Sequence, residues 1–150
     1  MSKIYDDITI VTVLYNTNRI VENFFNDFKN FKIIVVDNGK NQNILNEIKG
    51  LKNLKIITKN KNLGYGGAIN FAYEEVSTKF FLVLNPDLKI DEKSIEGMYE
   101  VISKHSDCGI VAPITHPDED FYGAFPERNL KSISSFNAQK SRDLLSKSAI

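Results

Sequence analysis

The sequence is poor in cysteine, has no net charge and lacks any long apolar segment. Its one cysteine, Cys108, cannot form an intrachain disulfide, which favours a cytoplasmic protein over a secreted, disulfide-stabilised one. Because 19 Lys and Arg residues balance 19 Asp and Glu residues, no basic surplus indicates a nucleic-acid partner. No apolar run approaches the roughly 20 residues of a membrane-spanning helix. Asp6 and Asp7 interrupt the N-terminal segment, so we expect no signal peptide.

What the sequence does contain is enough apolar material for one domain. The chain has 150 residues, of which 42% are hydrophobic, and it shows no internal repeat. We therefore expect a single domain over residues 1–150. The pattern weakens after Pro113, and residues 132–150 are predicted to form one weakly patterned helix. This fading predicts a truncated domain, the first half of a longer protein.

Short β-branched runs alternate with segments of helical spacing. The predicted strands are residues 8–15, Lys32–Asp37, Leu54–Thr58, 80–84 and 109–113. Four helices are predicted. The first carries Ile20, Phe24, Phe25 and Phe28, with Thr17 or Asn18 as N-cap, and the second covers residues 43–49 and ends at Gly50. The third starts at Gly66 or Gly67 and turns Ile69, Phe71 or Ala72, Tyr73 and Val76 toward the sheet, and the fourth is capped by Asp91 and has Ile95, Met98, Tyr99 and Ile102 as its apolar stripe. This alternation predicts an α/β fold, with a mostly parallel sheet and helices on both faces.

Polar residues follow four of the predicted strands, where open α/β sheets bind their ligands. The candidate site residues are Tyr15 and Asn16; Asp37, Asn38 and Gly39; Asn62, Gly64, Tyr65, Gly66, Gly67 and Asn70; and Asn85 with Asp87. Each group also has a purely structural interpretation. Asp37-Asn38-Gly39 is a common tight-turn sequence, although the carboxylate could accept a hydrogen bond from a nucleobase imide.

The glycine-rich segment and the Asn85-Pro86-Asp87 segment have similar alternatives. Residues 64–67 could bring backbone N–H groups close to a phosphate, or could be a turn for close packing, and Ile69 stands where a dinucleotide fingerprint would place its last glycine. Proline ends the strand before Asp87 rigidly. Asp87 could then hold a divalent cation together with phosphate oxygens, or lie in an ordinary turn.

Four segments in order, "IVTVLYN", "IIVVDNGK", "NLGYGGAIN" and "FLVLNPDLKI", resemble the N-terminal, nucleotide-sugar-binding half of family 2 glycosyltransferases with the GT-A fold, in particular the bacterial rhamnosyltransferase-like branch. The resemblance covers residues 8–113. It implies a UDP- or dTDP-sugar donor, a divalent metal such as Mn²⁺ or Mg²⁺, and transfer with inversion to a hydroxyl of a glycan or lipid-linked acceptor. It also implies a cytoplasmic protein that reaches the inner membrane face through that acceptor.

The resemblance also assigns roles to the candidate residues. Tyr15, Asn16 and Asp37 would hold the base and ribose, with Asn38, Gly39 and Asn85 also in the nucleotide site. The segment from Asn62 to Asn70 would line the pocket, and Asp87 would bind the metal. Asn85 departs from the family, in which an aspartate is common at that position.

No counterpart of the family's general base is found in the sequence, so the catalytic residue is unknown. The acidic segment at residues 116–120 is interpreted as a solvated loop. We therefore expect the isolated chain to bind donor but to transfer little sugar, and an exposed sheet edge to favour a homo-oligomer. Two alternatives stay open: a non-catalytic nucleotide-binding or assembly module, and a dinucleotide-binding oxidoreductase domain.

Overall fold

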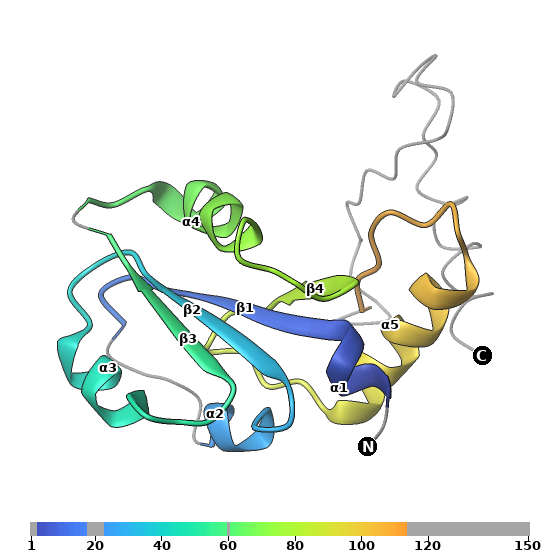
Figure 1. Ribbon diagram of the computed structural model, residues 1–150, viewed down its shortest axis with the longest axis horizontal. Helices are drawn as coiled ribbons and strands as arrows, with labels where there is room; N and C mark the ends of the chain where they lie inside the picture. Colours follow the sequence, from blue (N-terminus) through green and yellow to red (C-terminus); the bar gives the residue numbers. More distant parts are fainter. Residues whose placement is uncertain (1–2, 18–22, 60, 114–150) are drawn as a thin grey trace, which may run out of the picture. The chain divides into compact units, whose positions relative to one another are not determined.

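The computed structural model describes residues 3–17, 23–59 and 61–113 and has alternating helices and strands (Figure 1). The elements in order are α1 (Lys3–Asp7), β1 (Ile8–Leu14), α2 (Phe24–Asp27), β2 (Lys32–Asp37), α3 (Gln42–Ile48), β3 (Leu54–Thr58), α4 (Gly64–Tyr73), β4 (Phe80–Val83) and α5 (Glu92–Lys104). Strands β2 and β3 have the predicted bounds, and β1 and β4 are each one residue shorter than predicted. By its internal contacts the chain divides into two compact units, Met1–Ile90 and Asp91–Ile150.

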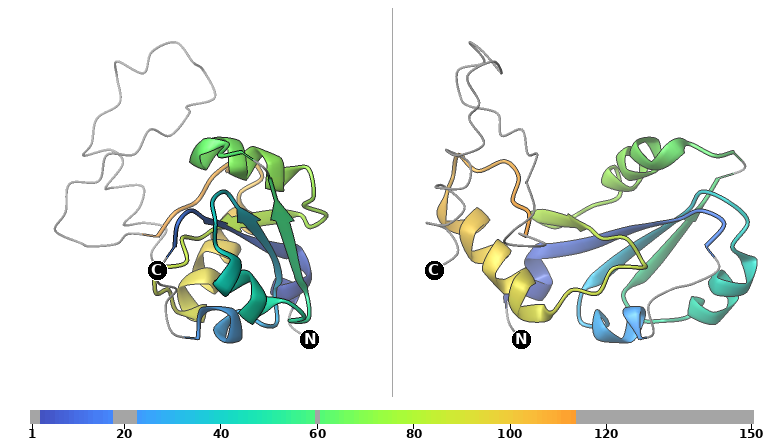
Figure 2. Two further views of the ribbon diagram at one scale, coloured as in Figure 1. Left: turned by 90° about the vertical axis from the view of Figure 1, so that its left-hand side faces the viewer. Right: turned by 180° about the vertical axis from the view of Figure 1, so that it is seen from behind.

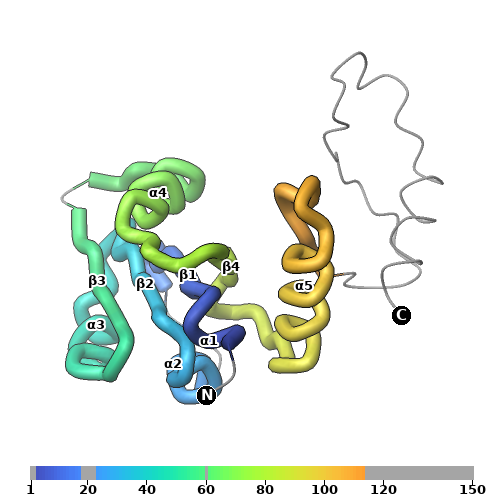
Figure 3. The backbone as a smooth tube through the Cα atoms, turned by 45° about the vertical axis from the view of Figure 1, so that its right-hand side comes forward, coloured from blue at the N-terminus to red at the C-terminus, as the bar shows by residue number. Residues whose placement is uncertain are grey.

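The first unit contains a four-stranded sheet in the order β3-β2-β1-β4, and every neighbouring pair of strands is parallel. Figure 3 follows the backbone from β1 through α2 to β2 and onward. β1 and β2 lie in the middle of the sheet and are continuous apolar runs, as is typical of parallel strands covered on both faces. A hydrogen bond of 2.7 Å between the Thr9 and Thr78 hydroxyls joins β1 to the segment that leads into β4.

Helices cover both faces of this sheet, as predicted. On one face, buried side chains of β1, β2 and β3 pack against Ala68 and Ala72 of α4. Helices α2 and α3 lie on the other side of the sheet (Figures 1 and 2). Side chains alternate between the two faces along a strand. Since Ile10 and Val35, which alternate with the α4-facing residues, have no exposed surface, the second face is buried as well.

Three helices differ from the prediction, and α3 (Gln42–Ile48) does so only by beginning and ending one residue earlier. The described part of α2 is a single turn whose N-cap is Asn23, with a left-handed φ of 67°, so Thr17 does not cap it, and Asn18 lies outside the described residues. Helix α4 starts at Gly64, earlier than Gly66. Gly64 has a φ of 70°, a conformation that glycine adopts without strain. Gly50 has a φ of 99°, which confirms the left-handed conformation expected after α3.

The residues in and just after α4 that were predicted to face the sheet do so to different extents: Ile69, Phe71 and Val76 pack against the core, whereas Tyr73 contacts Phe81 of β4 and stays largely exposed. Its side chain is 61% exposed and its ring lies 5.5 Å from the ring of Phe81. The small residues Ala68 and Ala72 take the inward positions of α4, because they let the helix approach the sheet closely. Tyr73, one position further along the chain, then lies at the margin of this packed face beside Phe81.

The second unit contains α5, which begins as predicted. Asp91 is its N-cap, and the carboxylate accepts a 2.7 Å hydrogen bond from the backbone N–H of Ser94. Ile95 and Met98 are the buried members of its apolar stripe. The strand predicted at residues 109–113 is absent: the segment is irregular, Ile110 is 71% exposed, and no described strand pairs with it. Pro113 offers no ladder donor and Gly109 has no side chain to pack, which leaves too few strand-forming residues.

The segments at residues 116–120 and 132–150 lie outside the described residues. Among the helices that the structure describes, none has the length and apolar character needed to cross a bilayer.

Candidate functional site

The four polar segments lie at the carboxyl ends of the four parallel strands, and therefore at one edge of the sheet (Figure 1). The loops after β1 and β2 are in direct contact. The backbone N–H of Asn38 donates to the carbonyl of Leu14 at 2.8 Å, which extends the β1–β2 pairing past the end of β2. The hydrogen bonding of the sheet therefore holds the loops after β1 and β2 together.

Gly39 shows how closely these two loops approach each other. A Cβ atom at this position would lie 2.9 Å from both the backbone nitrogen and Oδ1 of Asn16, and 3.3 Å from Cδ2 of Tyr15. Asn16 itself has a left-handed φ of 45°. No residue larger than glycine fits at position 39 without moving the loop after β1, so the close approach of the two loops requires Gly39.

Asp37 is 4% exposed, and its carboxylate organises the loop after β2. Oδ1 accepts hydrogen bonds from the backbone N–H of Gly39, at 3.2 Å, and from Nδ2 of Asn41. Oδ1 of Asn41 in turn accepts from the backbone N–H of Thr17 at 2.7 Å. Asn41 and Thr17 therefore belong to the site region, although the sequence analysis did not include them. The only signal for Asn41 was its place four residues after Asp37.

Asn38 is 3% exposed and links the end of β2 to the glycine-rich segment. Its Oδ1 accepts from the backbone N–H of Leu63 at 2.7 Å. Its Nδ2 donates to Oδ1 of Asn62 at 2.7 Å and to the carbonyl of Gly64 at 3.1 Å. One buried amide thus satisfies backbone and side-chain groups of a loop 24 to 26 positions further along the chain.

Asn62, which Asn38 contacts, also holds the N-terminus of α4. Oδ1 of Asn62 accepts from the backbone N–H of Gly64 at 2.8 Å, so Asn62 satisfies one of the donors that a helix start leaves without an intrahelical acceptor. A Cβ on Gly66 would meet nothing within 4 Å, whereas one on Gly67 would lie 3.3 Å from Cβ of Leu63. The helix therefore presents an open first turn with its positive dipole end.

Asn70 is the candidate that the structure does not bring to the others. It is exposed, and it lies between Ala68 and Ala72, whose side chains face the sheet. At helical spacing its side chain is directed away from the sheet, and no described hydrogen bond joins it to another candidate residue.

Asn85 and Asp87 lie in a turn after β4. The backbone N–H of Leu88 donates to the carbonyl of Asn85 at 3.1 Å, so the segment is a four-residue turn. The hydroxyl of Tyr65, on the first turn of α4, donates to Oδ1 of Asn85 at 2.7 Å. Partial burial, and secondly the negative charge of Asp87, raise the pKa of Tyr65 above its ordinary value of 10.0, so the phenol keeps its proton and stays a donor. The segment Asn85-Pro86-Asp87 is therefore a turn and also one of the candidate-site loops, so the two interpretations are compatible.

The described residues at this edge offer few ligands to a divalent metal, so phosphate oxygens of a bound nucleotide would have to supply most of them. Asp87 is an exposed carboxylate. Among the described residues there is no group of three or more His, Cys, Asp or Glu side chains arranged to hold a metal. Mg²⁺ and Mn²⁺ sites of phosphate-binding proteins commonly use one or two carboxylates plus phosphate oxygens. Asp87 matches that pattern, and Asn85 adds no second carboxylate.

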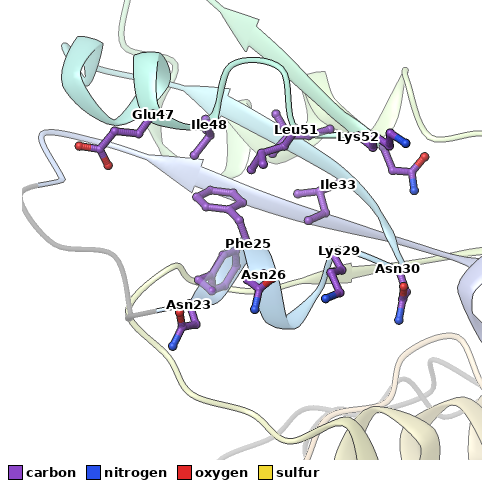
Figure 4. Close-up of a pocket in the computed structure, with 13 residues that line it drawn as sticks. Asn23, Phe25, Asn26, Lys29, Asn30, Ile33, Glu47, Ile48, Leu51 and Lys52 are labelled. Carbon is purple, nitrogen blue, oxygen red and sulfur yellow. The ribbon is translucent and has the colours of Figure 1, made fainter.

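A depression of about 690 Å³ lies at the opposite ends of the strands (Figure 4). It is formed by α2, the end of α3 and the first residues of β2 and β3, with Phe25, Ile33, Ile48 and Leu51 among the residues that line it. None of the candidate site residues lines it. This depression and the polar strand ends are therefore separate features.

Comparison with known proteins gives one family and one fold. The model of the family described as glycosyl transferase family 2 matches residues 9–148. A low-salt glycan biosynthesis hexosyltransferase of Haloferax volcanii is 27% identical over 113 residues, which is 72% of this chain and 36% of that protein. A teichoic acid poly(glycerol phosphate) polymerase of Staphylococcus epidermidis is 27% identical over 143 residues, which is 89% of this chain and 19% of that protein.

The fold has a solved counterpart in S. aureus TarS 1–349. The structures superpose with a TM-score of 0.56 at 19% identity, over 75% of this chain and 40% of that one. This likeness supports the α/β fold alone. The chain spans about a third or less of the length of the two curated relatives.

Proposed function

The chain belongs to glycosyl transferase family 2, and from this premise we propose that residues at the carboxyl edge of its sheet bind the nucleotide of a sugar donor. The observation that carries the proposal is the hydrogen-bonded junction of strand-end loops, in which Asn38 joins the loop after β2 to the start of α4, and Tyr65 joins α4 to the turn after β4. The complete enzyme would build a glycan or a teichoic-acid-type polymer, in keeping with the names of its relatives.

The proposed donor is a UDP- or dTDP-sugar, the type that the rhamnosyltransferase-like motifs imply. Asp37 recognises the imide of the base through its carboxylate, which the Gly39 N–H and the Asn41 amide hold in one orientation. Tyr15 and Asn16 lie beside Gly39, where they reach the base and ribose. The positive end of α4 faces the diphosphate, whose oxygens approach the open backbone at Gly66.

Asp87 is the proposed protein ligand of a divalent metal. Such a metal, when bound, would offset the negative charge that develops on the leaving nucleoside diphosphate. The reaction itself would be a direct displacement that inverts the anomeric carbon, with the acceptor hydroxyl as nucleophile. This chain's described residues contribute the binding and orientation of the leaving group, which are large terms in such transfers.

A thermal-shift titration tests the proposal. The chain is heated with UDP, dTDP or NAD, each with and without Mn²⁺, as wild type and as Asp87→Ala. A nucleotide at about 100 times its dissociation constant should stabilise the fold by roughly 2.7 kcal/mol, which is a shift of a few degrees. We expect a Mn²⁺-dependent shift with UDP or dTDP that Asp87→Ala abolishes.

Lys89→Ala is the matched control, since Lys89 is an exposed residue just beyond the same turn. It should keep the shift. A wild-type chain that responds to neither UDP nor dTDP would contradict the proposed function, and a response to NAD alone would indicate a dinucleotide-binding domain.

A further inference from the structure

We propose that Tyr65 fixes the side-chain amide of Asn85 so that Asn85 acts as a hydrogen-bond donor to a phosphate oxygen of the nucleotide, and not as a metal ligand. The inference rests on the proposed function, because it concerns the same nucleotide site. It assigns Tyr65 as a positioning residue, whose hydroxyl acts through Asn85, and Asn85 as a residue that touches the ligand.

The argument starts from the two ends of the Asn85 amide. An asparagine side chain has one oxygen, which accepts, and one NH₂ group, which only donates. The Tyr65 hydroxyl occupies Oδ1 at 2.7 Å. Among the described residues, Nδ2 of Asn85 makes no hydrogen bond, and the side chain is exposed. The group left for a ligand is therefore a donor.

Rigid elements hold this arrangement. Tyr65 lies on the first turn of α4, next to Gly64, whose carbonyl is held by the buried amide of Asn38. Asn85 follows the buried Leu84 and opens the turn closed by the Leu88 N–H. Because both partners are anchored, their hydrogen bond sets the amide plane without ordering a mobile loop. Such preorganisation lowers the cost of binding.

The chemistry at this position then suits an anion. A neutral donor beside Asp87 can approach a diphosphate without adding a second negative charge, and hydrogen bonds to charged groups are the stronger ones. A carboxylate at position 85 would instead repel phosphate in the absence of a metal. In this proposal Asn85 donates a hydrogen bond to phosphate, so the asparagine has a role of its own and is more than the loss of one metal ligand.

The test measures the affinity of the 150-residue chain for UDP and dTDP by isothermal titration calorimetry, in EDTA and in Mn²⁺. Uridine and thymidine serve as ligands without phosphate. We expect Asn85→Asp to weaken diphosphate binding in EDTA about tenfold or more, with nucleoside binding unchanged. Tyr65→Phe keeps the ring and removes only the hydroxyl, and should weaken diphosphate binding about three- to tenfold.

A double-mutant cycle separates the positioning role from direct contact. In an Asn85→Ala background, Tyr65→Phe should cause no further loss, because Tyr65 acts only through Asn85. Tyr73→Phe is the matched control, since Tyr73 is an exposed tyrosine of the same helix, and it should bind as wild type does. Melting temperatures confirm that each variant is folded.

Three results would overturn the inference. If Asn85→Asp leaves the diphosphate affinity in EDTA unchanged, Asn85 is not a donor to phosphate. If Tyr65→Phe tightens diphosphate binding in Mn²⁺, the freed Oδ1 of Asn85 binds the metal, which also contradicts the donor role. Additive losses in the cycle would mean that Tyr65 touches the ligand itself. If the wild-type chain binds neither UDP nor dTDP, the proposed function itself is contradicted. The first three results contradict only the roles of Tyr65 and Asn85, so the two kinds of failure can be told apart.

Discussion

Two glycines of the candidate site differ in the space that the fold leaves around them. Gly39 has no room for a Cβ, because the loop after β1 lies against it at 2.9 Å. Gly66 has open space around it and lies in the first turn of α4, with no left-handed φ. The fold therefore requires glycine at position 39 and leaves room for a side chain at position 66, where we propose that a ligand approaches the backbone.

Gly66→Ala should therefore separate stability from binding. We expect the free energy of unfolding to rise by about 0.5–1 kcal/mol, because alanine favours a helix. Nucleotide affinity should fall about tenfold, since the methyl group would stand where a phosphate approaches the backbone. Denaturant unfolding and calorimetric titration measure the two effects.

Gly97→Ala is a matched control in α5, where a Cβ also meets nothing within 4 Å. It should stabilise the chain similarly and leave nucleotide affinity unchanged. If Gly66→Ala binds nucleotide as tightly as wild type, the ligand does not approach this turn of α4.

At the scale of elements, the start of α5 depends on one carboxylate. Hydrogen bonds from the side chain and backbone of Ser94 lower the pKa of Asp91 below its ordinary value of 3.8. A carboxyl with a lowered folded-state pKa stabilises the fold fully above its unfolded pKa, and this stabilisation is lost as pH falls through the folded value. The contribution of Asp91 is thus present near neutral pH and disappears only in acid, below about pH 4.

Substitution at position 91 distinguishes capping from charge. Asp91→Ala should lower the melting temperature and the helical circular dichroism at every pH, because the cap is lost. Asp91→Asn keeps a capping oxygen without a titrating group, so it should stay close to wild type near neutral pH and lose less stability in acid. An Asp91→Asn variant with the full acid sensitivity of wild type would assign that sensitivity to other carboxyl groups.

Elements were predictable from the sequence where one physical signal decided them. Strands β2 and β3 are β-branched runs closed by polar residues, and their bounds were predicted correctly. The segment at residues 109–113 has Gly109 and Pro113 at its ends, and a strand there would also need a neighbouring strand, which a local pattern does not reveal. Tyr73 lies outside the core because α4 packs through alanines, and small side chains give a weaker periodic signal than aromatic ones.

The candidate site was predictable as a set of loops but not as a set of bonds. The rule that parallel strands carry ligands at their carboxyl ends brought all four loops to one edge. Which amide meets which backbone group depends on side-chain geometry after the sheet has formed. The hydrogen bonds of Asn38 with Leu63, of Tyr65 with Asn85 and of Asn41 with Asp37 depend on such geometry, so the sequence did not reveal them.

At the scale of the whole molecule, the polar edge and the 690 Å³ depression lie at opposite ends of the strands. Hydrogen exchange with and without nucleotide should tell them apart. With UDP or dTDP and Mn²⁺ we expect slower exchange in peptides that cover residues 15–17, 37–41, 62–67 and 85–88. Peptides that cover α2 and the turn between α3 and β3 should not change, which serves as an internal control. Protection at the depression instead would move the nucleotide site to the amino ends of the strands.

The strand order β3-β2-β1-β4 has a consequence for the time course of folding. The links among the first three strand ends join residues 24 to 26 positions apart, whereas the Thr9–Thr78 hydrogen bond that accompanies β4 joins residues 69 positions apart. Contacts between distant residues form late, because closing a long loop costs entropy before any contact compensates for it. During synthesis β1, β2 and β3 can pair before β4 has been made. We therefore expect the pairing of β4 with β1 to complete the sheet last, while the link from Tyr65 to Asn85, which spans only 20 positions, keeps the turn after β4 close to α4.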